Sequence, residues 1–152
     1  MYSYDDQNRL IGLHVSDSLH VFEKVYSFIY QEDKMFKSVC NYISNEPSAI
    51  TIPAGVTYIE DYAFENCYNM TGITFEAGGT ALTIGANAFA SCDALKTIEL
   101  PACTTSIGAS AFEGTPLTAF TIPEAVTSLG AKALKGTKIT TIHIPANVTS
   151  IG

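Results

Sequence analysis

The chain has 152 residues, a length that suits one domain of ordinary size. Hydrophobic residues make up 47% of it and charged residues 15%, well below the usual charged share of about 25%, so the chain is not a disordered polyelectrolyte and can bury a core. The formal net charge is -7, from 8 basic and 15 acidic residues. This balance argues against nucleic acid and anionic membrane surfaces as partners, because both repel carboxylates.

No apolar run approaches the roughly 18 residues that span a bilayer, so membrane insertion is not expected. The first residues, Met1 to Asp6, lack the basic and apolar regions of a secretory signal. Two locations follow: the cell surface or the outside of the cell if a signal has been removed, and the cytoplasm otherwise.

Residues 1–48 form a lead segment whose composition differs from the rest. Five of the eight tyrosines precede Ile50, and Gly12 is the single glycine there. Apolar residues recur at helical spacing in two stretches, which predicts helices around Leu19–Ile29 and Met35–Ile43, and a strand is expected over Leu10–Leu13. We expect a mainly helical N-terminal cap over the first coil of a repeat array. Two alternatives stay open: the end of an upstream domain, or a degenerate first repeat, in which Phe36 to Cys40 would correspond to Phe64 to Cys67.

Residues 49–152 are repetitive. Four units can be stacked, residues 50–72, 73–97, 98–119 and 120–141, and a partial fifth runs from Ile142 to Gly152. Each unit opens with an apolar-x-apolar run, which predicts a short half-buried strand; these runs are Ile50–Ile52, Ile73–Phe75, Ile98–Leu100, Phe120–Ile122 and Ile142–Ile144. Proline follows four of the five runs and ends the strand, because it has no N–H for a ladder. The second unit has Glu76 there and a longer turn with Gly78 and Gly79.

A second extended patch follows in each unit, with Val56–Ile59 as its first copy. The glycine after the later copies is expected to serve a tight turn or unusual backbone angles; these glycines are Gly85, Gly108, Gly130 and Gly152. A short helical turn with an Ala and a bulky apolar residue comes next, and Phe64, Phe89 and Phe112 are its expected core anchors. Stacking such units gives a right-handed coil with short parallel strands, because one unit cannot bury its own apolar face.

The repeated pattern IxIPxxVTxIGxxAFxxC resembles the BspA-like (Treponema pallidum type) leucine-rich repeat. The resemblance covers about residues 48–152 and is best over Ile50–Cys67 and Ile98–Phe112. It implies a curved solenoid and a non-enzymatic role in adhesion or protein binding, as part of a larger bacterial surface protein with a protein or host-surface ligand. It offers no catalytic residues and no cofactor. The alternative is an intracellular or structural scaffold, in which the repeats act as a spacer.

The outward strand positions are the candidate binding face: Thr51, Thr74, Glu99, Thr121 and His143. A regular, rigid and exposed ladder suits a binding surface, but threonine also favours exposed strand sites without any function. His143 and Glu99 lie two coils apart, about 10 Å by strand spacing, which excludes a direct acid–base pair. His14 and His20 fall in the lead segment. With no known catalytic motif in the chain, no catalytic residue is assigned.

The four cysteines, Cys40, Cys67, Cys92 and Cys103, show no zinc-ligand spacing, so no metal site is expected. Cys67 and Cys92 occupy the same repeat position, where a disulfide or metal pair is conceivable. We expect buried free thiols instead, because later units have Thr115 and Thr137 there.

Two further features concern partners. The lysines at 132, 135 and 138 form either a solvated face or a patch for an acidic partner. Ile144, Val148 and Ile151 would face an empty position after the broken fifth unit, so we expect either further repeats or self-association to cover this open C-terminal coil.

Overall fold

The protein is seen in a computed structural model that describes residues 2–4, 10–16, 23–31, 34–40, 48–52 and 54–152, with side chains for residues 49–52 and 54–152. These residues form eleven β-strands and no helix. The strands are β1 (Tyr2–Tyr4), β2 (Leu10–Ser16), β3 (Glu23–Gln31), β4 (Lys34–Cys40), β5 (Ser48–Ile52), β6 (Tyr58–Ile59), β7 (Met70–Phe75), β8 (Leu82–Ile84), β9 (Thr104–Ile107), β10 (Ser128–Leu129) and β11 (Ser150–Ile151).

The predicted helical cap is wrong where the structure describes it. Strands β1 to β4 pair antiparallel in sequence order, and only the strand expected at Leu10–Leu13 is confirmed. The spacing of Val25, Tyr26 and Ile29 fits a helix, but β-branched and aromatic residues prefer a pleated sheet, and a short apolar run does not separate the two by period alone. The ends of the predicted helices, Leu19 and Ile43, lie outside the described residues.

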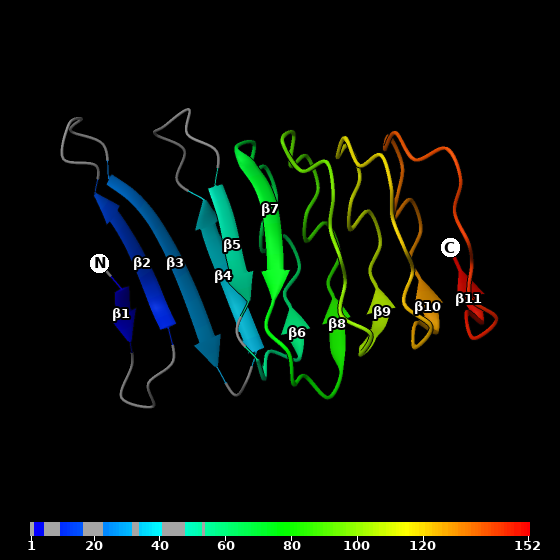
Figure 1. Cartoon of the computed structure of the whole chain (residues 1–152), viewed down its shortest axis with the longest axis horizontal. Helices are drawn as coiled ribbons and strands as arrows, with labels where there is room; N and C mark the ends of the chain where they lie inside the picture. The colour runs from blue at the N-terminus through cyan, green and yellow to red at the C-terminus, as the bar shows by residue number, and fades with distance from the viewer. Residues whose placement is uncertain (1, 5–9, 17–22, 32–33, 41–47, 53) are drawn as a thin grey trace.

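The lead segment continues into the solenoid as one sheet. Strand β4 pairs in parallel with β6, and β8, β9, β10 and β11 follow in parallel, so nine strands form a single sheet (Figure 1). The register sets Met35 opposite Ile59. The next residue, Phe36, is therefore level with residue 60 and not with Phe64, the correspondence that the degenerate-repeat alternative assumed.

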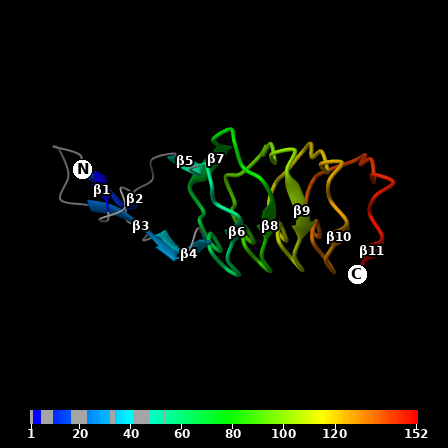
Figure 2. The same cartoon turned by 90° about the horizontal axis from the view of Figure 1, so that it is seen from below.

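The coils of residues 49–152 enclose a core between two extended layers (Figure 2). One layer is the ladder, defined here as strands β6, β8, β9, β10 and β11; the other contains the two-stranded parallel sheet of β5 and β7. The expected Phe anchors are confirmed, because all three rings are fully buried. Phe64 stacks on Phe89 with ring centroids 5.1 Å apart, and Phe89 stacks on Phe112 at 5.3 Å. Burial of each such ring stabilises the stack by roughly 1.5–3 kcal/mol.

The predicted helical turn is instead a run of overlapping β-turns. In the first coil, Ala63, Glu65 and Cys67 each donate a backbone N–H to the carbonyl three residues earlier. The alternate N–H groups, of Tyr62, Phe64 and Asn66, donate to carbonyls of the next coil. Every second N–H therefore points along the solenoid axis, which a helix does not allow. The left-handed conformations that these turns need recur four residues apart in each coil, as at Asn87 (φ 53°) and Ser91 (φ 56°).

The glycines after the ladder strands do not have the unusual backbone angles that were one expectation. None of Gly85, Gly108, Gly130 and Gly152 has positive φ. They are needed for close approach: a Cβ on Gly108 would lie 2.6 Å from the carbonyl carbon of Gly85, and one on Gly85 would lie 2.7 Å from the amide nitrogen of Asp61. Glycine thus lets each turn rest on the backbone of the preceding coil.

The two extended segments of each coil differ from the prediction. The second patch forms the continuous ladder, with hydroxyls such as Thr127 Oγ1 donating to the carbonyl of Thr105 at 3.3 Å. The opening run forms a strand only in the first two coils, as β5 and β7; residues 98–100, 120–122 and 142–144 are not strands. The Glu76 N–H donates to the Ile52 carbonyl at 2.9 Å. Proline holds the corresponding position in the later coils and has no N–H to donate.

Candidate functional site

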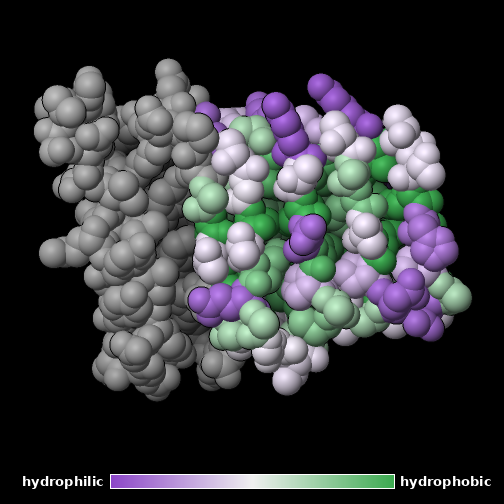
Figure 3. All heavy atoms as spheres, viewed as in Figure 1, coloured by the Kyte–Doolittle hydropathy of each residue, from purple (hydrophilic) through white to green (hydrophobic). Residues whose placement is uncertain are grey.

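The five predicted face residues lie at equivalent positions on one side of the solenoid, and all five are exposed. Thr51 pairs with Thr74 across β5 and β7, while Glu99, Thr121 and His143 lie in the later opening runs. The residues directly before them in the first four coils are buried, which turns the face residues outward; these are Ile50, Ile73, Ile98 and Phe120. Figure 3 shows this side as a mixture of polar and apolar side chains. We call it the strand face.

The backbone of the strand face is open in its later coils. Within the described residues 97–152, no backbone hydrogen bond joins residues 98–100 to 120–122, or 120–122 to 142–144. Peptide N–H and C=O groups on this side are therefore available to water or to a ligand. The face offers hydroxyls, one carboxylate, one imidazole and these backbone groups, all of which can form hydrogen bonds with a partner.

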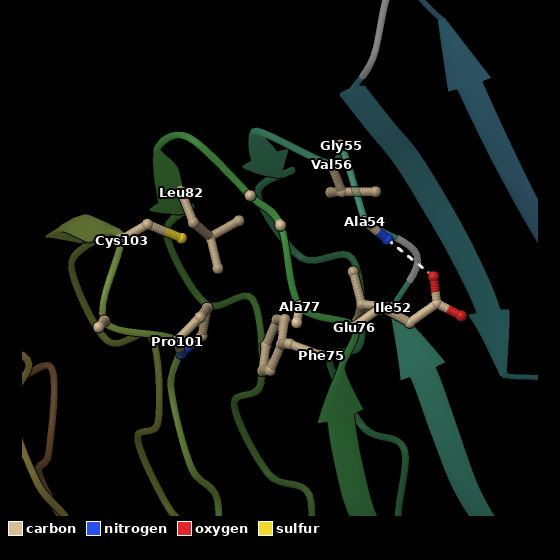
Figure 4. A pocket seen from close by; sticks show the side chains of 13 residues that line it. Ile52, Ala54, Gly55, Val56, Phe75, Glu76, Ala77, Leu82, Pro101 and Cys103 are labelled. Atoms are coloured by element: carbon tan, nitrogen blue, oxygen red, sulfur yellow. Dashed lines mark hydrogen bonds between the residues drawn. The ribbon is translucent and has the colours of Figure 1, made fainter.

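A depression of about 260 Å³ adjoins the strand face where β5 and β7 end (Figure 4). Its walls are mainly apolar, with Ile52, Phe75 and Leu82 among them, and the Cys103 sulfur also lines it. The longer turn of the second coil forms one side. The Glu76 side chain ties this turn to the first coil, because its Oε2 accepts the Ala54 N–H at 3.0 Å. This pocket was not predicted from the sequence, although the longer second unit with Glu76 in place of proline was its signal.

The cysteines correct one expectation. Cys67 is disulfide-bonded, so the prediction of a free thiol there is wrong. Cys92 is free and fully buried as expected, and its Sγ donates to the Phe64 carbonyl at 3.1 Å. Burial raises the pKa of Cys92 to about 12, so the thiol stays protonated and unreactive near neutral pH. Cys103 is free and half-buried.

Among the described side chains, no three His, Cys, Asp or Glu residues are grouped closely enough to hold a metal ion. Of the three histidines only His143 has a described side chain; His14 has a described backbone in β2, and His20 lies outside the described residues. The described residues also include no helix of the length and apolarity that a membrane span needs.

Comparison with known families gives a match over most of the chain. The BspA type leucine rich repeat region matches residues 31–152 in six copies. The chain belongs to this family. The match begins at the last residue of β3 and so takes in β4, before residue 49 where the sequence pattern placed the first unit. The division at residues 48 and 49 stays a prediction.

Solved structures agree with the family assignment. A leucine-rich repeat protein from Eubacterium ventriosum is 32% identical with a TM-score of 0.62; the match covers 69% of this BspA-type chain and only 27% of that chain. The leucine-rich repeat protein of T. pallidum has a TM-score of 0.53 at 16% identity, over 84% of this chain and 78% of that one, and shows the shared fold. No curated protein matches the sequence.

Proposed function

We propose that the chain is a non-enzymatic protein-binding or adhesion module of a larger cell-surface protein, and that the strand face carries the binding. The observation that carries this proposal is the strand face itself: five exposed side chains at equivalent repeat positions, on the side whose later coils leave backbone groups unpaired. Leucine-rich repeat arrays present such extended surfaces to protein partners. The proposed partner is a protein or another ligand of a host surface.

The pocket gives the strand face an apolar anchor site, which its small side chains do not provide. Threonines give a flat surface, whereas binding energy concentrates where an apolar anchor enters a well-packed depression. At about 260 Å³, the pocket is smaller than the roughly 300–1,000 Å³ typical of cofactor or drug-sized sites. It suits one apolar side chain of a protein partner, at the end of the face near Thr51 and Thr74.

The disulfide at Cys67 supports a surface or secreted location. Disulfides form and persist in oxidising compartments and are rare in the cytosol. A cytoplasmic scaffold would gain nothing from this bond, because thiol-reducing systems there would open it.

A spacer is the second candidate, and the continuous sheet favours it. Pairing of β4 with β6 joins the lead segment to the solenoid through backbone hydrogen bonds. Such a joint is stiff, so the repeats would hold another part of the parent protein at a fixed distance without binding anything themselves.

Photo-crosslinking separates the two candidates. A benzophenone amino acid is placed at Thr121 on the strand face or at Thr127 on the ladder side; both threonines are exposed and belong to the same coil. The two proteins are incubated with intact, surface-biotinylated epithelial cells and irradiated. The adhesion proposal expects biotinylated adducts mainly from position 121, and fewer when Thr74 is also changed to Lys. Equal yields from both positions, or none from either, would rule out binding by the strand face and favour the spacer.

A further inference from the structure

The β-turns of successive coils stack into a second outer surface, the turn edge, formed by residues 60–68, 85–93, 108–116 and 130–138. Its alignment is fixed by backbone hydrogen bonds between coils. Tyr62 donates to the Ala86 carbonyl at 2.9 Å, Asn87 to Ala109 at 2.9 Å, and Ser110 to Ala131 at 2.8 Å. Residues at the same place in each turn therefore form columns along the solenoid axis.

The charge of the turn edge changes from one end to the other. Its first coil carries Glu60, Asp61 and Glu65, together with Tyr62 and Tyr68, which are 54% and 42% exposed. Its fourth coil carries exposed lysines at 132, 135 and 138, which are three of the four lysines whose side chains are described. Burial, followed by the negative charges of Asp61 and Glu60, raises the pKa of Tyr58 beside the first coil. One end is thus acidic and aromatic, and the other is basic.

A glutamate and a lysine pair readily on this edge when they are neighbours. Lys135 and Glu113 share a column in adjacent coils, and their charged atoms lie 2.7 Å apart. The hydrogen bond from Lys135 is the main reason that the pKa of Glu113 is lowered. Glu65 belongs to the same column, but the next residue of that column is Ala90. Among the described side chains, the charges of Glu60, Glu65, Lys132 and Lys138 have no ion-pair partner.

We propose that two copies of the chain associate through their turn edges in antiparallel orientation, with the acidic, tyrosine-bearing end of each copy on the lysine end of the other. A two-fold axis between the copies makes the same contact twice. The unpaired carboxylates then meet unpaired ammonium groups, and exposed tyrosine rings face lysines, a geometry that favours cation–π contact. Parallel pairing would set like charges against each other and is excluded.

The association is weak and sensitive to salt. Three coil steps of about 4.8 Å make the edge about 14 Å long, so the interface falls below the roughly 1,000 Å² of stable complexes. Exposed charge pairs are screened at a Debye length of about 3 Å in 1 M salt and about 10 Å in 0.1 M salt. Self-association is therefore expected at low salt and high protein concentration, and high salt should suppress it.

Sedimentation velocity of the complete chain, with two charge-reversed forms, tests the proposal. One form carries K132E and K138E, and the other carries E60K and E65K. Each alone should remain monomeric, because the net charges of its two ends then have the same sign. An equal mixture should restore a one-to-one complex near the wild-type affinity. The matched control K96E, outside the edge, should associate like the wild type, and circular dichroism should show that every form is folded.

The outcomes that overturn the proposal are distinct. Wild-type chain that stays monomeric at low salt contradicts it, as does self-association that survives either reversal, or a mixture that forms no complex. Loss of association on Ile151→Lys, with both charge-reversed forms still associating, would assign the contact to the C-terminal coil. None of these outcomes bears on the strand face. Crosslinking from Thr121 tests binding to a cell-surface protein, whereas sedimentation tests binding to a second copy of the chain.

Discussion

The two extended segments of each coil differ in how they are joined to the neighbouring coils. Both are extended, and both repeat along the solenoid. The ladder is joined by backbone hydrogen bonds from β6 to β11, whereas the opening runs pair only between β5 and β7. The chemical difference is small: Glu76 supplies an N–H where Pro101, Pro123 and Pro145 cannot.

The two sides therefore contribute differently to the stability of the solenoid. Backbone hydrogen bonds and close glycine contacts on the ladder side hold the coils together, and substitutions there should reach the whole stack. The strand face contributes its buried Ile and Phe residues to the core, and the side chains between them are exposed. Paired substitutions, one on each side, test whether the two sides contribute differently to stability.

Glycine substitutions should give the largest contrast. Gly108→Ala would put a Cβ 2.6 Å from the backbone of Gly85, and overpacking against backbone typically costs about 1–3 kcal/mol or more. Gly72→Ala on β7 meets nothing within 4 Å and should be neutral or stabilise by up to about 1 kcal/mol, since alanine reduces the entropy of the unfolded chain. Urea unfolding of both variants measures the contrast. Equal midpoints would show that the coils can separate at the ladder without cost.

Threonine substitutions should give an intermediate contrast. Thr127→Val removes a hydroxyl that donates to the Thr105 carbonyl at 3.3 Å, and we expect a loss of about 0.5–1 kcal/mol. Thr121→Val on the strand face should stay within about 0.5 kcal/mol of the parent protein, because surface changes away from special contacts have small effects. Thermal melts at one protein concentration provide the measurement. A larger loss at position 121 would mean that the strand face is bonded internally after all.

The smallest expected effect on stability comes from an ion pair on the turn edge, and it depends on pH. The pKa of Glu113 is lowered in the folded chain, so its ion pair with Lys135 stabilises the fold above the ordinary carboxyl pKa. That contribution fades as the pH falls from about 4.5 through the lowered pKa, where the carboxylate takes up a proton. Glu113→Gln should therefore be slightly less stable than the parent at pH 7 and equal to it at low pH. Lys135→Gln should weaken the same pH dependence, because the Lys135 hydrogen bond is the largest cause of the lowered pKa, while Lys96→Gln should leave it intact in urea titrations.

The candidate site was predictable in position but not in environment. Period-two alternation was sufficient to turn Thr51, Thr74, Glu99, Thr121 and His143 outward, because a buried neighbour fixes the direction of the next side chain. The pocket beside the face needs atoms from three coils that are distant in sequence, so its existence could not be derived from any single unit. The Cys67 disulfide was likewise missed, because spacing alone does not say which thiols meet.

The repeat, the solenoid, the family and the buried Phe anchors could be predicted from the sequence. Each of these follows from a pattern that recurs at every coil, and recurrence makes a local signal strong. Only the tertiary structure decided which extended segment closes into a ladder, why glycine follows it, and that the lead segment is a sheet. Those outcomes depend on the backbone of a neighbouring coil or strand: whether it offers an N–H, how closely it approaches, and whether it leaves an edge to pair with.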